Sequence, residues 1–139
     1  MDWVLTVALL HGACSTTYQP RRPGQVGVVI LHAAPMYVKD GRKVPIGPFG
    51  GDLEDLVADT PAAAACAHKA HTQFAVGVPA YLTGVTGVLI GIVALSGPAG
   101  WLVIGVGGLT AGTGLGFIGS GVTHTVDAVN IYNDGASER

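Results

Sequence analysis

The longest feature of the hydropathy pattern is a stretch without Asp, Glu, Lys or Arg, from residue 70 to residue 126. Apolar residues and glycines fill it, and the segment SGPAG at residues 96–100 divides it in two. A helix that crosses the roughly 30 Å hydrocarbon layer of a membrane needs about 20 residues, so two spans fit. Glycine and proline favour a turn between them. The pattern predicts a transmembrane helical hairpin over 76–123, with span cores at 80–96 and 101–122.

The alternative to a membrane hairpin is a buried apolar hairpin inside a soluble protein. The chain has only 139 residues, and so small a remainder could hardly cover two such helices on every side. Trp101 lies at the predicted turn and Tyr81 at the other end of the first predicted span, where aromatic residues of membrane interfaces are found. These observations favour the membrane.

Small residues recur within both predicted spans. In the second span a four-residue spacing places Gly108, Gly112, Gly116 and Ser120 on one stripe, and the first span carries Gly84, Gly87 and Gly91. Helices in a membrane have no hydrophobic drive to associate, so they rely on the close backbone contact that small residues permit. Because the turn is short, we expect the two surfaces to pack mainly within the hairpin. Packing between subunits is the alternative.

The N-terminus resembles a secretory signal peptide of a lipoprotein. Residues 1–13 contain a short apolar run and end in Gly-Ala before Cys14, and a polar linker over 14–24 follows. This pattern predicts cleavage before Cys14 and lipidation of its thiol, although His11 and Asp2 depart from the usual signal. The alternatives are an unmodified cysteine and a disulfide between Cys14 and Cys66, the other cysteine of the chain.

The segment 25–75 predicts a small α+β head. Residues 25–32 are β-branched and apolar, and Asp40-Gly41 suits the two positive-φ positions of a type I′ hairpin turn. So short a sheet must pack on something, and the following helices are the natural partner. Asp52 is a good N-cap for one helix, and Pro61 suits the first position of a second, which runs toward the membrane. The fold class is therefore membrane α+β.

The residue types that carry chemistry do not form a recognisable site. On a helix only His68 and His71 share a face, while Cys66 lies near the opposite side from His68, so a metal site is not expected. The carboxylates between 52 and 59 suit helix starts, and His124 suits the headgroup level. Because no nucleophile, phosphate-binding or dinucleotide motif occurs, we expect no enzyme, no metal and no cofactor. The net charge of −2 argues against nucleic acid as a partner.

Two segments, VVILHAAPMYVKDGRKVPIGPFGGDLEDLV and THTVDAVNIYND, are similar to pieces of small uncharacterised bacterial membrane lipoproteins. The matching positions are Tyr37, Val38, Asp40, Gly41, Arg42, Pro45, Gly47, Phe49, Gly50, Gly51, Leu53 and 127–134. The resemblance implies two glycine-rich spans that are closed by a DAVNIYND-like helix, and it implies no activity.

The C-terminal segment 124–139 predicts a helix that continues the second span and a short tail. Val126, Val129 and Tyr132 form an apolar stripe at helical spacing, which we expect to dock on the head. Gly135 is the expected end of the helix.

The sequence as a whole indicates a non-enzymatic, membrane-anchored lipoprotein of the bacterial cell envelope with a structural, scaffolding or assembly role. Two spans place the head and the C-terminus on the same side, which is the periplasm if Cys14 is lipidated after export. The partners expected are a lipid membrane and either further copies of the chain or another envelope protein. The alternative function is that of a subunit of an oligomeric helical pore or channel.

Overall fold

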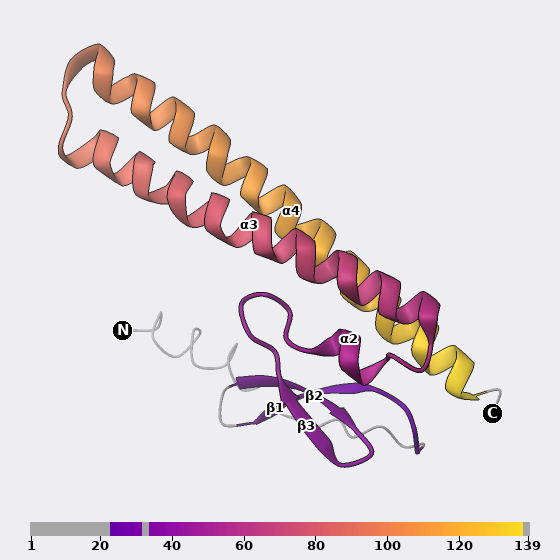
Figure 1. The fold of residues 1–139 in the computed structure, drawn as a ribbon. Coiled ribbons are helices and arrows are strands. Elements are labelled where there is room, and N and C mark those ends of the chain that lie inside the picture. Colours follow the sequence, from indigo (N-terminus) through magenta and orange to yellow (C-terminus); the bar gives the residue numbers. More distant parts are fainter. Residues whose placement is uncertain (1–22, 32–33, 138–139) are drawn as a thin grey trace, which may run out of the picture.

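The computed structural model describes residues 23–31 and 34–137. Figure 1 shows the sheet beside one end of a long helix pair, whose other end projects away from it. The predicted order, a small sheet followed by long apolar helices, is confirmed. In chain order the elements are β1 (Gly27–Leu31), β2 (Ala34–Lys39), β3 (Arg42–Pro45), α2 (Leu53–Leu56), α3 (Pro61–Val93) and α4 (Gly97–Ser137).

The sheet is an antiparallel meander in the order β1-β2-β3. Gly27 pairs with Val38 at one end of β1, and Leu31 pairs with Ala34 at the other. The pair Lys39 and Arg42 closes the second hairpin. Between them Asp40 has φ 49° and Gly41 has φ 81°, both in the left-handed region that a type I′ turn requires. The predicted turn is confirmed.

The core lies between the sheet and the helices rather than within the sheet. It includes Val26, Tyr37 and Val44 from the sheet region, Leu53, Leu56 and Val57 from α2 and its end, Ala63 and Ala67 from α3, and Ala128 and Tyr132 from α4. α3 contributes alanines to this core, and α2 packs closely against α3. A three-stranded sheet of this length is marginal alone, and here the two helices complete its apolar core.

The two long helices begin and continue largely as predicted, with one junction and one end that differ. α3 begins after Thr60, has Pro61 at its first turn and passes through Pro79 without a break, so the predicted second helix of the head and the first span are one helix. α4 continues through Gly135 to Ser137, the last described residue, which corrects the expected end at Gly135. Asp52 is the N-cap residue of α2, but its side chain makes no capping hydrogen bond.

Candidate membrane hairpin and its junction with the head

The closest contact between α3 and α4 is made by three glycines on each helix, and in each set the glycines are seven residues apart. Gly77, Gly84 and Gly91 on α3 face Gly114, Gly107 and Gly100 on α4, respectively, in an antiparallel register. We call these six residues the glycine seam. All six are buried, although the surrounding faces of both helices are largely exposed.

The seam brings the two backbones too close for any side chain. A Cβ at Gly91 would lie 2.7 Å from Ile104 Cγ1, and one at Gly107 would lie 2.8 Å from the Gly84 carbonyl oxygen. At Gly84 the added carbon would meet the backbone nitrogen of Ala111 more closely still. At Gly84 and Gly107 no rotamer change could relieve these contacts, because backbone atoms form them. At Gly91 the Gly100 carbonyl oxygen would still lie 3.0 Å from the added carbon if the Ile104 side chain moved. The packing of the hairpin therefore requires glycine here.

The same register continues with slightly larger residues toward the head. Ala63 and Ala128 are fully buried, and Ala70 is 3% exposed. Gly121 accommodates the Phe74 ring, which would lie 3.2 Å from a Cβ at that position. Seven residues rotate a helix about 20° short of two full turns, so a period of seven keeps small residues near one face over several heptads.

The structure separates the small residues that the sequence singles out into two groups. Gly84 and Gly91 belong to the seam, and Gly87 lies at its edge, where a Cβ would be 3.5 Å from Gly107 Cα. On α4 the predicted stripe does not face α3: a Cβ at Gly108, Gly112 or Gly116 would have nothing within 4 Å. Ser120 is half-buried and lies beside Gln73 in a shallow surface groove.

The expected packing of the α4 stripe against the first span is therefore corrected. A four-residue step advances the helix by about 40° beyond one turn, so such a stripe winds away from the partner helix. Sequence reasoning missed Gly77, Gly100, Gly107 and Gly114. The signal that would have found them is the seven-residue repeat, which occurs on both helices and ends at the turn between them.

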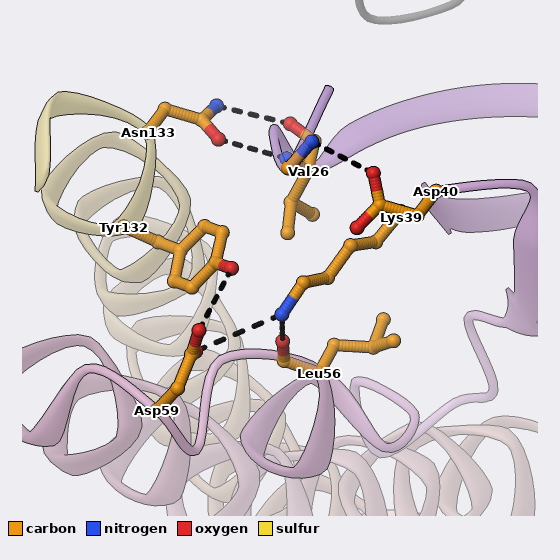
Figure 2. A network of polar contacts seen from close by, with 8 residues as sticks. Val26, Lys39, Asp40, Leu56, Asp59, Tyr132 and Asn133 are labelled. Carbon is orange, nitrogen blue, oxygen red and sulfur yellow. Dashed lines mark hydrogen bonds and ion pairs between the residues drawn. The ribbon is translucent and has the colours of Figure 1, made fainter. Parts of the chain in front are cut away.

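The C-terminal part of α4 joins the head through a polar network around Tyr132 (Figure 2). The Tyr132 hydroxyl donates to Asp59 Oδ2 at 3.2 Å. Lys39 Nζ lies 4.4 Å from the centre of the Tyr132 ring, donates to the Leu56 carbonyl oxygen at 2.6 Å and lies 3.6 Å from Asp59 Oδ1. Because the Lys39 side chain is only 19% exposed, these contacts replace most of its hydration.

The Asn133 side chain hydrogen-bonds to the backbone of Val26, the residue just before β1. Its Oδ1 accepts the Val26 backbone N–H at 2.8 Å, and its Nδ2 donates to the Val26 carbonyl oxygen at 3.0 Å. The amide thus pairs with both backbone groups of one residue, as a neighbouring strand would (Figure 2). The adjacent Gly24 N–H donates to Asp40 Oδ1 at 2.7 Å, which ties the same segment to the hairpin turn.

The face of α4 that docks on the head differs in part from the predicted stripe. Tyr132 is buried and Val129 packs partly against the core, as expected, but Val126 is 52% exposed. Ala128, which the predicted stripe omitted, is fully buried. The seam continues into this face, so a small residue rather than a valine occupies the point of closest approach.

An apolar groove of about 260 Å³ lies where the head meets the helices. It is lined by Val28 and Tyr37 from the sheet, residues 46–48 and Gly50 from the following loop, Phe74 from α3, and Val122, Thr125 and Val126 from α4. Burial raises the pKa of Tyr37 above its ordinary value of 10.0, and a side-chain hydrogen bond with Thr125 partly offsets this effect. The Tyr37 hydroxyl is therefore neutral at physiological pH.

The residue types that carry chemistry are separated in the structure. His68 Nδ1 lies 3.1 Å from Glu54 Oε2, and His71 Nδ1 donates to the Phe49 carbonyl oxygen at 3.1 Å. Cys66 packs partly against the apolar core instead. Within residues 23–31 and 34–137, no group of three or more His, Cys, Asp or Glu residues is placed to hold a metal ion.

Comparison of the chain with protein-family models, with curated protein sequences and with solved structures finds no match. Two helices, α3 and α4, are long and apolar enough to cross a membrane. Cys14 and the predicted signal segment lie outside the described residues. The hairpin and its junction with the head are therefore the features of the described residues that bear on function.

Proposed function

We propose that this chain is a non-enzymatic, membrane-anchored lipoprotein of the bacterial cell envelope, with a structural or scaffolding role. The glycine-lined hairpin crosses the membrane, and the head and the C-terminal part of α4 lie together on the periplasmic side. A lipid on Cys14 adds a second anchor at the same surface.

The exposure of the hairpin carries this proposal. Within the most apolar windows of α3 and α4, only 17% and 11% of the residues are buried inside the chain. Large apolar side chains near the turn are almost fully exposed, including Val93 at 82% and Trp101 at 76%. The core helices of a soluble monomer are mostly buried, whereas a hairpin of this kind needs an apolar medium on its outer surface.

A topology experiment tests the membrane hairpin. Single cysteines are placed at Arg42 in the head, Asn130 in the C-terminal part of α4 and Ser96 in the turn, with Cys14 replaced by Ser and Cys66 by Ala. All three native residues are exposed. Applied to cells with a permeabilised outer membrane, an impermeant thiol reagent should modify positions 42 and 130 and leave position 96 unmodified.

Two other patterns of cysteine modification would contradict the membrane hairpin. Modification at 42 and not at 130, or the reverse, would require an odd number of crossings and contradict the hairpin. Equal modification at all three positions would show that the helices do not cross a membrane.

The lipid anchor is tested by metabolic labelling with a clickable fatty acid. The full-length protein should become labelled, and Cys14→Ser should abolish the label. The variant should stay in the membrane fraction, because a single acyl chain contributes much less to anchoring than a helical hairpin. A label that persists in Cys14→Ser, or that never occurs, would contradict lipidation at this residue. Cys66→Ser is the matched control and should keep the label.

A homo-oligomer, including a helical pore, is the second candidate. Gly108, Gly112 and Gly116 face away from α3 and leave open space along α4. Beside them, Gln73 Oε1 is buried and has no hydrogen-bond partner among the described residues. A second copy that packed on this face would find the close backbone approach that small residues permit.

A further inference from the structure

The two ends of the head differ in charge. The turn between β2 and β3 carries Lys39, Asp40, Arg42 and Lys43, whereas residues 27–38 and 44–51 contain no Asp, Glu, Lys or Arg. The antiparallel register places the end of β1, the start of β2 and the end of β3 opposite to that turn. Residues 30–31, 34–36 and 45–51 therefore form one end of the sheet with its adjoining loop, which we call the charge-free end. The carboxylates of Asp52, Glu54 and Asp55 belong to the N-cap and helix α2 that follow this loop.

The charge-free end points toward the uncharged part of the hairpin. At the other end of the sheet, Val26 is bonded to Asn133 in the last turns of α4. Two residues further along β1, Val28 shares the apolar groove with Val122 and Val126. The direction of β1 is thus toward the α3–α4 turn, and Figure 1 shows the loop between β3 and α2 reaching up beside the helices.

The charge-free end also lies at the depth expected for a membrane surface. His71, which donates to the Phe49 carbonyl oxygen, is separated from Val93 by about 33 Å of helix at 1.5 Å per residue. On α4, Trp101 and Val122 are about 31 Å apart by the same measure. The hydrocarbon layer is roughly 30 Å thick. If the α3–α4 turn lies at one surface, the groove and Phe49 lie at the other.

Apolar side chains at this level are exposed. Ile30 is 66% exposed, Val28 45% and Phe49 41%. The groove beside them is lined by uncharged residues of the described chain, and two of these, Phe74 and Val122, belong to the helices of the hairpin. The surface is therefore continuous with the apolar exterior of α3 and α4, and the same medium that covers the hairpin reaches the head.

We infer that the charge-free end of the head docks on the surface of the membrane that the hairpin crosses, with Ile30 and Phe49 immersed in its interfacial layer. This inference rests on the proposed function, since the hairpin brings the surface to this level. Apolar groups of interfacial segments reach about 5–10 Å into the boundary between headgroups and acyl chains. An acyl chain of a bilayer lipid occupies the groove, and the charged turn at residues 39–43 points into the aqueous phase.

Quenching by lipid-borne nitroxides tests this docking. The full chain carries Cys14→Ser and Cys66→Ala, so that one introduced cysteine is its only thiol for a fluorophore. The labelled positions are Phe49 and Ile30 at the charge-free end, Arg42 at the opposite end and Leu109, which is 77% exposed on the hairpin. Each protein is reconstituted in two sets of phosphatidylcholine vesicles, one with nitroxide on the acyl chains near the headgroup and one with nitroxide near the ends of the acyl chains. Labels at 49 and 30 should lose most of their emission in the first set, the label at 109 should do so in the second, and the label at 42 should lose little in either.

The four labels test the membrane hairpin and the docking of the head separately. A label at 109 that is quenched, while those at 49 and 30 behave like 42, would overturn the docking and leave the membrane hairpin standing. A label at 109 that is not quenched would contradict the proposed function and the docking together. Circular dichroism and size exclusion select the labelled proteins that retain their fold, and two positions at the charge-free end are used so that one poorly folded variant does not decide the result.

Discussion

Gly84→Leu is expected to destabilise the hairpin by about 3 kcal/mol or more, because the new side chain has no space at the seam. A Cβ alone would lie 2.6 Å from the Gly107 carbonyl oxygen, so α3 and α4 must separate along several turns. The measurement is thermal unfolding of the detergent-solubilised protein, monitored by the far-UV circular dichroism signal of its helices. A clearly lower unfolding midpoint is the expected result.

Gly112→Leu is the matched control, since it makes the same substitution on α4 where nothing lies within 4 Å. It should leave the midpoint unchanged or raise it, because leucine favours a helix over glycine by up to about 1 kcal/mol. Equal losses in the two variants would contradict the division between seam and outer stripe. The control also tests the oligomer: a fall in the mass of the protein–detergent complex at an unchanged midpoint would show that Gly112 packs between copies.

Tyr132→Ala is expected to release the head from the hairpin, with a loss of about 3–5 kcal/mol in the stability of the head. The substitution empties a buried ring site, removes the hydroxyl donor to Asp59 and takes away the ring beneath Lys39. Hydrogen exchange measured by mass spectrometry should show lost protection in β1, β2 and β3. Protection of α3 and α4 between the seam glycines should persist, because that contact does not involve Tyr132.

Ile131→Ala provides the comparison for Tyr132→Ala. It truncates a large apolar side chain one residue away, and Ile131 is 37% exposed, so exchange in the sheet should change little. If both variants leave the sheet protected, the head is stable without the junction. If both expose it equally, the effect comes from the helix end as a whole and the specific role of the Tyr132 network is wrong.

Features that depend on a few neighbouring residues were predictable from the sequence. The Asp40-Gly41 turn requires positive φ at both positions, which glycine tolerates freely and aspartate more readily than most residues do. The two long apolar helices follow from the absence of charge between residues 70 and 126. The break between them was predicted at SGPAG, residues 96–100, but lies at residues 94–96, because α4 begins at Gly97. In both cases the signal lies within the segment that adopts the structure.

The faces that meet across the fold were harder to predict. The stripe at Gly108, Gly112 and Gly116 and the seam at Gly107 and Gly114 occupy the same helix, and α3 decides between them by matching a glycine to each seam position. Asn133 and Val26 are 107 residues apart in the sequence, so no pattern within a short segment could predict their pairing. The apolar groove arises only when the sheet, the loop and both helices are assembled.

The pairing between Asn133 and Val26 also sets the order in which the protein is assembled. During synthesis the segment around Val26 leaves the ribosome long before Asn133 does, and between them lie both apolar helices. The start of β1 thus lacks its amide partner, and the core lacks Ala128 and Tyr132, until the last part of α4 has been made and delivered to the same side. Contacts of such long sequence separation form late, after the entropy of loop closure has been overcome. In the proposed topology, completion of the head therefore requires that both spans have been inserted.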